Sequence, residues 1–216
     1  MNGIDGPLVY TPGDNEWTDC QRPVWGDYDP RERLTVLRKM FFPGRQSLGR
    51  TPITLERQAD ISSRHTRMVE NVRWQIRGVL FATAHVVGSN NGLRGDDVAA
   101  NAEWIGALFE LARTECATAV VLAFQAAPYL LYGLGDGFRR TLDSIETGAA
   151  AYGGPVLVVH GDGHVYTRDN PFYGPLGQTL VNVLRVEVPS ALDIRAVRIR
   201  IDPRVPVIFD VEVFSG

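Results

Sequence analysis

The sequence is poor in cysteine, in long apolar runs and in excess charge. Its two cysteines are too few for a disulfide framework or a thiolate metal cage, so we expect free thiols in a reducing compartment, the cytoplasm. No run of about 18 apolar residues occurs, which argues against a membrane-spanning helix. The N-terminus lacks the basic start and apolar core of a secretion signal. A net charge of −3 gives no electrostatic reason to expect nucleic acid or an anionic membrane as a partner.

What the sequence does contain is typical of a soluble globular domain. It has 216 residues, of which 44% are hydrophobic and 22% are charged. A chain of this length can bury about 70% of the surface that its unfolded form exposes, so its core needs no covalent support. We predict a single domain over residues 1–216.

Helical and strand patterns alternate along most of the chain, and strands dominate its last part. A helix is expected from Asp29, because a capping aspartate, Pro30 and Glu32 precede an apolar stripe. Further helices are expected over 96–116 and over a segment that ends near Gly153. Strands are expected at 8–11, 72–87 (one bent or two), 119–124, 155–160, 164–168, 180–188, 194–201 and 207–214.

This order of elements predicts a layered α/β domain. The domain contains either a single mixed sheet or two sheets packed face to face with helices outside.

The segment VYTPGDNEWTDC, residues 9–20, is dense in side chains that carry oxygen. Pro-Gly-Asp-Asn favours a turn by itself, and a plain turn is one interpretation. The other interpretation depends on position, since the segment follows a predicted central strand and open α/β sheets bind ligands at the carboxyl ends of their strands. Asp14, with Asn15 and Glu16 beside it, is then a candidate binding residue.

The segment VLVVHGDGHVY, residues 156–166, is the second candidate. Asp162-Gly163 between two apolar runs predicts a two-residue hairpin. A hairpin does not account for the histidines on either side, His160 and His164. Imidazole nitrogen together with carboxylate oxygen suits Zn, Mn, Fe or Ni better than Ca or Mg, so a metal or catalytic role is the alternative.

The segment FATAHVVGSNNG, residues 81–92, is the third. Strand alternation puts Phe81, Thr83 and His85 on one face. A single strand histidine is usually structural, and Ser-Asn-Asn-Gly by default forms a turn. His85 and Asn90 nevertheless also lie at the carboxyl end of a predicted strand. No G-x-S-x-G motif occurs, so a serine hydrolase has no support.

Taken in order, these segments resemble the calcineurin-like metallophosphoesterase superfamily. The closer resemblance is to a bacterial branch with the signatures Y-T-P-G-D-N-E-W-T-D-C and A-T-x-H-V-V-G-S-N-N, matched at residues 10–20 and 82–91. The resemblance implies an αββα sandwich of two mixed sheets flanked by helices. It also implies two divalent transition metals (Mn, Fe or Zn), about 3.5–4 Å apart, that act on a small phosphate ester.

The resemblance also assigns roles to residues of this chain. Asn15 stands where the family has the histidine that protonates the leaving group, and an amide cannot do so, which implies a preference for activated esters. Asp162 stands where the family has a metal-binding histidine, and Gln125 where it has another. The implied metal ligands are Asp14, Asp162 and His164; the implied catalytic residues are Asn15, His85 and His160; and Glu16, Asn90 and Gln125 line the implied pocket.

Two motifs of the superfamily, D-x-H and G-D, should precede Tyr10, and only nine residues stand there. We therefore expect an N-terminally truncated domain that lacks the first strands of the sandwich. The predicted function is a metal-dependent phosphoester hydrolase, impaired by the loss of these motifs. The alternatives are a catalytically silent relative that binds a ligand on the same loops, and a fragment without activity of its own.

Overall fold

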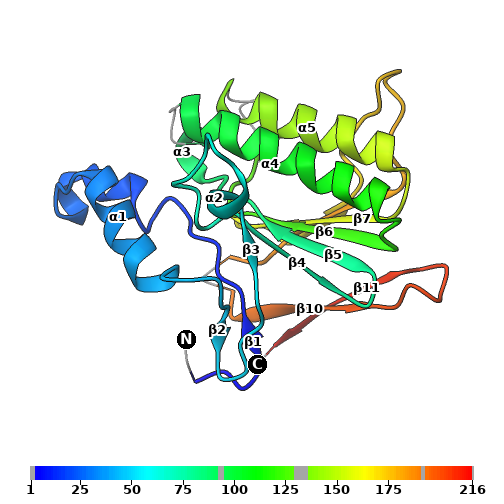
Figure 1. Ribbon diagram of the computed structural model, residues 1–216, viewed down its shortest axis with the longest axis horizontal. Coiled ribbons are helices and arrows are strands. Elements are labelled where there is room, and N and C mark those ends of the chain that lie inside the picture. Colours follow the sequence, from blue (N-terminus) through cyan, green and yellow to red (C-terminus); the bar gives the residue numbers. More distant parts are fainter. Residues whose placement is uncertain (1–2, 92–94, 129–135, 191–192, 216) are drawn as a thin grey trace.

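The computed structural model describes residues 3–91, 95–128, 136–190 and 193–215. The chain forms a mixed α/β structure in which helices cover one face of a seven-stranded mixed sheet and a two-stranded sheet lies beneath the other (Figure 1). The predicted layered α/β architecture is confirmed at this level. Within the described ranges, no helix combines the length and the apolar character that crossing a bilayer requires.

The central sheet has the strand order β3-β4-β5-β6-β7-β9-β8. Its strands are β3 (Glu56–Arg57), β4 (Val72–Ile76), β5 (Val79–Thr83), β6 (Ala119–Ala123), β7 (Val156–His160), β8 (Thr167–Asp169) and β9 (Val183–Glu187). Strands β5, β6, β7 and β9 run parallel, and the remaining strands add antiparallel edges. The sequences AVVLA of β6 and VLVVH of β7 are apolar almost throughout because both faces of a central parallel strand are covered.

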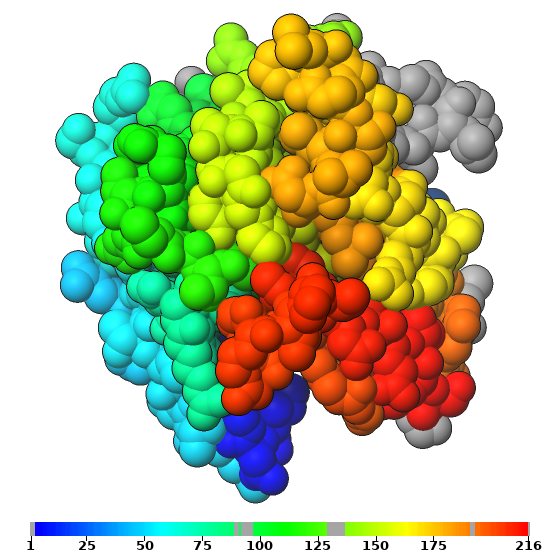
Figure 2. All heavy atoms as spheres, turned by 90° about the vertical axis from the view of Figure 1, so that its right-hand side faces the viewer, coloured from blue at the N-terminus to red at the C-terminus, as the bar shows by residue number. Residues whose placement is uncertain are grey.

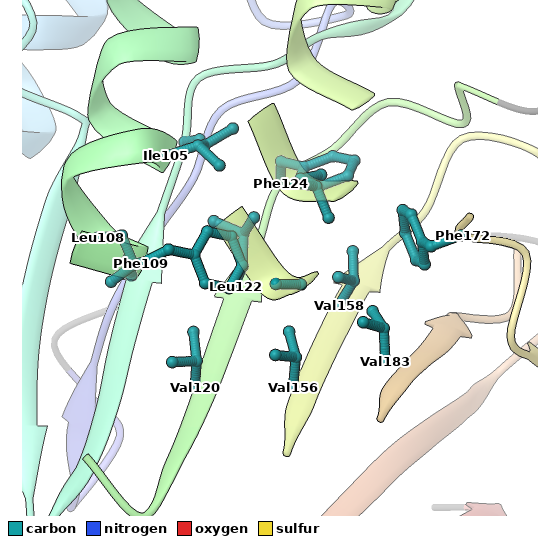
Figure 3. Close-up of a cluster of buried hydrophobic side chains, with 14 of the residues drawn as sticks. Ile105, Leu108, Phe109, Val120, Leu122, Phe124, Val156, Val158, Phe172 and Val183 are labelled. Atoms are coloured by element: carbon teal, nitrogen blue, oxygen red, sulfur yellow. The ribbon is translucent and has the colours of Figure 1, made fainter. Parts of the chain in front are cut away.

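Helices α4 (Gly95–Thr114) and α5 (Asp136–Tyr152) cover one face of this sheet (Figure 1). Figure 3 shows the core between the layers, where side chains of α4 meet side chains of β6 and β7. Buried side chains at this interface include Ile105, Leu108, Phe109, Leu122 and Val158. Each contributes roughly 1.5–3 kcal/mol by leaving water, so this layer fixes the strands whose ends carry the candidate site.

The other face is covered by β10 (Arg195–Ile201) and β11 (Phe209–Ser215), which pair antiparallel. Val197, Ile199 and Ile201 of β10 pack toward the central sheet, while the arginines between them face water. The prediction of a strand over 194–201 is therefore confirmed, and one face of this strand is exposed to solvent. Figure 2 views this hairpin from its turn, with the C-terminal residues in red.

The N-terminal part of the chain lies beside the sheet. It contains β1 (Pro7–Leu8), the 3-10 turns η1 (Thr18–Gln21) and η2 (Pro23–Trp25), α1 (Pro30–Phe41), β2 (Leu48–Gly49) and α2 (Gln58–Ile61), and α3 (Gly88–Asn91) follows β5. Helix α1 begins as predicted, since Asp29 Oδ1 accepts hydrogen bonds from the N–H groups of Arg31 and Glu32 at 2.7 and 3.2 Å. Leu34 and Leu37 of α1 are buried in a cluster with Trp17.

The predicted central strand at 8–11 is wrong. Strand β1 pairs with β2 in a small sheet of its own. The ring of Tyr10 packs on Phe41 and Phe42, with centroids 5.1 and 5.9 Å away, which draws the segment toward α1.

The predicted two-residue hairpin at Asp162-Gly163 is also wrong. Strand β7 has parallel neighbours on both sides, β6 and β9. The strand that follows the loop, β8, therefore joins the sheet beyond β9. Pairing with strands from distant parts of the chain has overridden the local hairpin signal.

Candidate functional site

The acidic loop at residues 13–19 is a turn built on Asp14. The backbone oxygen of Asp14 accepts hydrogen bonds from the N–H groups of Trp17 and Asp19, both at 3.1 Å, and from Thr18 Oγ1. Glu16 Oε2 accepts from the N–H of Gly13 at 2.8 Å, so the Glu16 carboxylate closes the turn. Asn15 is exposed at its tip. The turn predicted for this segment is therefore confirmed, and the binding role of Asp14 stays a prediction.

Gln125 ties this loop to the carboxyl edge of the sheet. It lies just after β6, and Gly88 and Gly161 follow the neighbouring parallel strands β5 and β7. Gln125 Oε1 accepts from the Gly88 N–H at 2.7 Å, and Nε2 donates to Asp14 Oδ1 at 3.1 Å. The Gly161 N–H donates to the Gln125 backbone oxygen at 3.0 Å. All three candidate segments therefore meet at the edge where open α/β sheets bind ligands.

The carboxylates of Asp14 and Asp162 converge on a small space beside Gly88. A Cβ atom at Gly88 would overlap Oδ2 of Asp14 and would lie 2.8 Å from Oδ2 of Asp162. Burial raises the pKa of Asp14, and the negative charges of Asp162 and Asp19 raise it further. The charge of Asp162 thus disfavours the ionised form of Asp14, and a cation between the two carboxylates would relieve this repulsion.

His164 does not complete a metal site with this pair. Its side chain is exposed, and its backbone has a φ of 65°. In the part of the chain that the structure describes, no group of three or more His, Cys, Asp and Glu side chains is placed to hold a metal ion. The pair of carboxylates supplies oxygen donors, the ligand type that Mg²⁺ or Mn²⁺ prefers. It does not fit two transition metals bound through imidazoles.

His160 ends β7 and is 2% exposed. Its ring stacks on Phe124 at an angle of 6°, and Nδ1 lies 3.0 Å from the backbone oxygen of Gly161. A carbonyl oxygen can only accept, so Nδ1 carries the proton and Nε2 is a lone-pair acceptor. Nε2 has no hydrogen-bond partner among the described residues. Burial lowers the pKa of His160 to about 4, which keeps the ring neutral near pH 7.

His85 lies beneath the acidic loop, with the ring of Trp17 5.4 Å away. Its Nδ1 lies 2.6 Å from Glu70 Oε1, a contact that is close but poorly aligned for a hydrogen bond. Arg38 of α1 binds the same carboxylate with two nitrogens, at 3.0 and 2.5 Å. Burial alone would raise the pKa of Glu70, but His85 and Arg38 together lower it to about 2. These contacts hold α1, β5 and the acidic loop together.

Asn90, the remaining predicted pocket residue, lies in α3, and its side chain is outside the described part of the structure. Three residues that shape the site had no predicted role: Gly88, Glu70 and Arg38. Gly88 could have been noticed, because a glycine directly after a strand end often marks a close approach of the backbone. Glu70 and Arg38 meet across many residues, and nothing in their local sequence marks the contact.

No protein-family model and no curated protein matches the chain. The metallophosphoesterase resemblance therefore stays a prediction.

Proposed function

We propose that this protein is a divalent-cation-dependent phosphoester hydrolase of the metallophosphoesterase type. The observation that carries the proposal is the convergence of Asp14 and Asp162 on the space beside Gly88. These two carboxylates come from distant segments and meet at the carboxyl edge of a parallel sheet. The family resemblance assigned metal-binding roles to both.

Three layers support the proposal of an αββα sandwich: helices α4 and α5, the central mixed sheet and the β10–β11 sheet (Figure 1). The second sheet is two-stranded and antiparallel, and not mixed as predicted. The N-terminal part, with α1, lies to the side of these layers.

Each residue of the site has a chemical part in the proposal. Asp14 and Asp162 would hold a cation such as Mn²⁺, which would polarise a phosphoryl oxygen. Gln125 donates to Asp14 Oδ1 and keeps this carboxylate turned toward Asp162. Asn15 is exposed next to Asp14, where the family has its acid, and cannot protonate a leaving group. The substrates are therefore small phosphate esters with activated leaving groups, such as nitrophenyl phosphate.

The first test is Mn²⁺ binding by calorimetry, with Asp14→Asn and Asp162→Asn as variants. Each variant should weaken binding by about tenfold or more, which corresponds to 1.4 kcal/mol or more. Asp143→Asn is the matched control, because Asp143 is an exposed aspartate on α5, and its affinity should equal that of the wild type. Wild-type protein that binds no Mn²⁺ at millimolar concentration would contradict the proposal.

The second test is turnover. Nitrophenyl phosphate should be hydrolysed in the presence of Mn²⁺ and much faster than an alkyl phosphate. Equal rates on the two esters would show that a protonating group is present after all.

One observation favours a second candidate, a silent relative that binds a ligand without turnover. Gln125 makes hydrogen bonds to Gly88 and Asp14, as a structural amide does, where the family has a metal-binding histidine. This candidate predicts Mn²⁺ binding and phosphate binding with no release of nitrophenol.

A further inference from the structure

The outer edge of the central sheet is incompletely paired beside β4. Strands β3 and β4 form this edge (Figure 1), but β3 lies opposite only Val72 and Arg73 of β4. Thr54, which would come next and lie opposite Gln75, forms a bridge with Gln46 instead. The segment before β3 therefore turns away from β4, and within the described ranges no strand lies beside Gln75 on this side.

The main chain of Gln75 faces this gap. The N–H of Gln58 donates to the backbone oxygen of Asn71 at 2.9 Å, so Asn71 turns its oxygen toward the β3 side. In an antiparallel ladder this direction alternates from one residue to the next, so Arg73 and Gln75 face the same side as Asn71. Arg73 meets Glu56 of β3, whereas no strand lies opposite the N–H and C=O of Gln75. Such an unpaired edge is a template for another extended chain.

A groove of about 520 Å³ lies along the gap. Its walls include Trp74, Ile61 and Ile76, and the last two are 50% and 46% exposed. Apolar side chains beside an open sheet edge suit the alternate side chains of an added strand. Ile76 pairs with Val79 at the start of β5, so the groove lies away from the carboxyl edge that holds the candidate cation site.

The charged residues of the groove favour a basic ligand. Arg73 forms a salt bridge with Glu56. Arg45 forms another with Asp60, at 3.1 Å. Glu115 also lines the groove, and it forms no salt bridge with any residue that the structure describes. It directly follows α4, whose C-terminus adds a partial negative charge, so the potential here attracts a lysine or an arginine.

We propose that the β4 edge is a docking site for an extended, basic segment of another protein, which joins the central sheet as a strand antiparallel to β4. The main chain of this segment exchanges hydrogen bonds with Gln75. Its apolar side chains cover Trp74 and Ile76, and a lysine or arginine lies beside Glu115. Docking at this edge does not require the proposed hydrolase activity.

The test measures binding of a fluorescent pentapeptide, Val-Lys-Val-Lys-Val, to the full chain by fluorescence anisotropy. Gln75→Pro removes the N–H that the peptide would bind, at an edge position where a strand tolerates proline, and should weaken binding about tenfold or more. Gln75→Ala is the matched control, because it keeps the N–H, and it should bind as the wild type does. If Gln75→Pro does not fold, a fully N-methylated peptide, which cannot donate to Gln75, should show the same loss on the wild type.

Glu115→Gln tests the charge of the partner. It should weaken binding of the lysine peptide several-fold and should not weaken binding of Val-Gln-Val-Gln-Val. Glu110→Gln is the matched control, since Glu110 is an exposed glutamate on α4 that pairs with Arg113, and it should change neither affinity.

Three results would overturn the inference. The first is a wild type that does not bind the lysine peptide at millimolar concentration, or that binds it as tightly when Gln75 is proline as when it is alanine. The second is equal affinity for Val-Glu-Val-Glu-Val, which would exclude a basic partner. The third is a wild-type dimer in sedimentation velocity that Gln75→Pro converts to a monomer, which would assign the edge to a second copy of the chain.

Discussion

Gly88 is the residue on which the geometry of the candidate site depends most directly. It is the first residue of α3, after a short connection from β5, and its N–H donates to Gln125. Because Gly88 has no side chain, the carboxylates of Asp14 and Asp162 can occupy the same space.

Gly88→Ala should weaken Mn²⁺ binding about tenfold or more, because the methyl group would lie between the two carboxylates. Calorimetric titration measures the effect. The matched control is Gly106→Ala on α4, where a Cβ atom meets open space. That change should leave binding intact and stabilise the helix by roughly 0.5–1 kcal/mol. Gly88→Ala with wild-type affinity would mean that the cation does not lie between Asp14 and Asp162.

At the scale of residues, the sequence predicted the two carboxylates of the candidate site but not the side chains that support the site. Asp14 and Asp162 could be proposed together because the family resemblance assigned a metal-binding role to each, although the strand predicted before Asp14 is not part of the central sheet. Glu70 could not. Its role comes from its contact with His85, which exists only once the strands are in register.

At the scale of elements, α1 connects the capping signal in the sequence to the support of the acidic loop. Asp29 caps its first turn, and its last turn carries Arg38, which binds Glu70 beneath the loop. Loss of the cap should therefore destabilise the first turn of α1 and also weaken the contact that its last turn makes with Glu70.

Asp29→Ala should lower the free energy of unfolding by about 1 kcal/mol, because two N–H groups lose their acceptor. Urea denaturation measures the change. Asp29→Asn keeps an oxygen that can cap and should cost much less. Equal losses in the two variants would show that the charge of Asp29, rather than its hydrogen bonds, stabilises the helix.

The elements that could be predicted are those with a long periodic pattern or a long apolar run. The helices that became α1, α4 and α5 and the strands that became β6 and β7 are examples. The predicted strand at 8–11 and the predicted hairpin at 162–163 were wrong for one reason. Each depended on a pairing partner, and the partner was decided by distant parts of the chain.

At the scale of the whole molecule, the buried ionic cluster of Glu70, Arg38 and His85 contributes to stability in acid. The pKa of Glu70 is about 2 in the folded protein against 4.5 for an ordinary glutamate. A carboxyl group whose pKa is lowered by folding stabilises the fold above its unfolded value. That contribution is lost as the pH falls from about 4.5 to about 2.

Glu70→Gln should destabilise the protein by about 3–5 kcal/mol near pH 7, because Arg38 and His85 lose a buried partner. It should also flatten the fall in stability between pH 4.5 and 2, which denaturation at a series of pH values would measure. The matched control is Glu110→Gln, which removes an exposed carboxylate paired with Arg113. Its pH dependence should resemble that of the wild type. If the stability of Glu70→Gln still fell between pH 4.5 and 2 as that of the wild type does, a group other than Glu70 would cause the fall.

The side-chain amide of Gln125 links two of the loops that form the candidate site. One end accepts from Gly88 and the other donates to Asp14, so a single side chain braces two loops against each other. An amide has no proton to gain or lose in the ordinary pH range, so the hydrogen bond from Gly88 to Gln125 does not depend on pH, whereas the bond to Asp14 is stronger while Asp14 is ionised. Neither loop can move away from Gln125 without breaking one of these hydrogen bonds, so the amide couples the positions of the two loops.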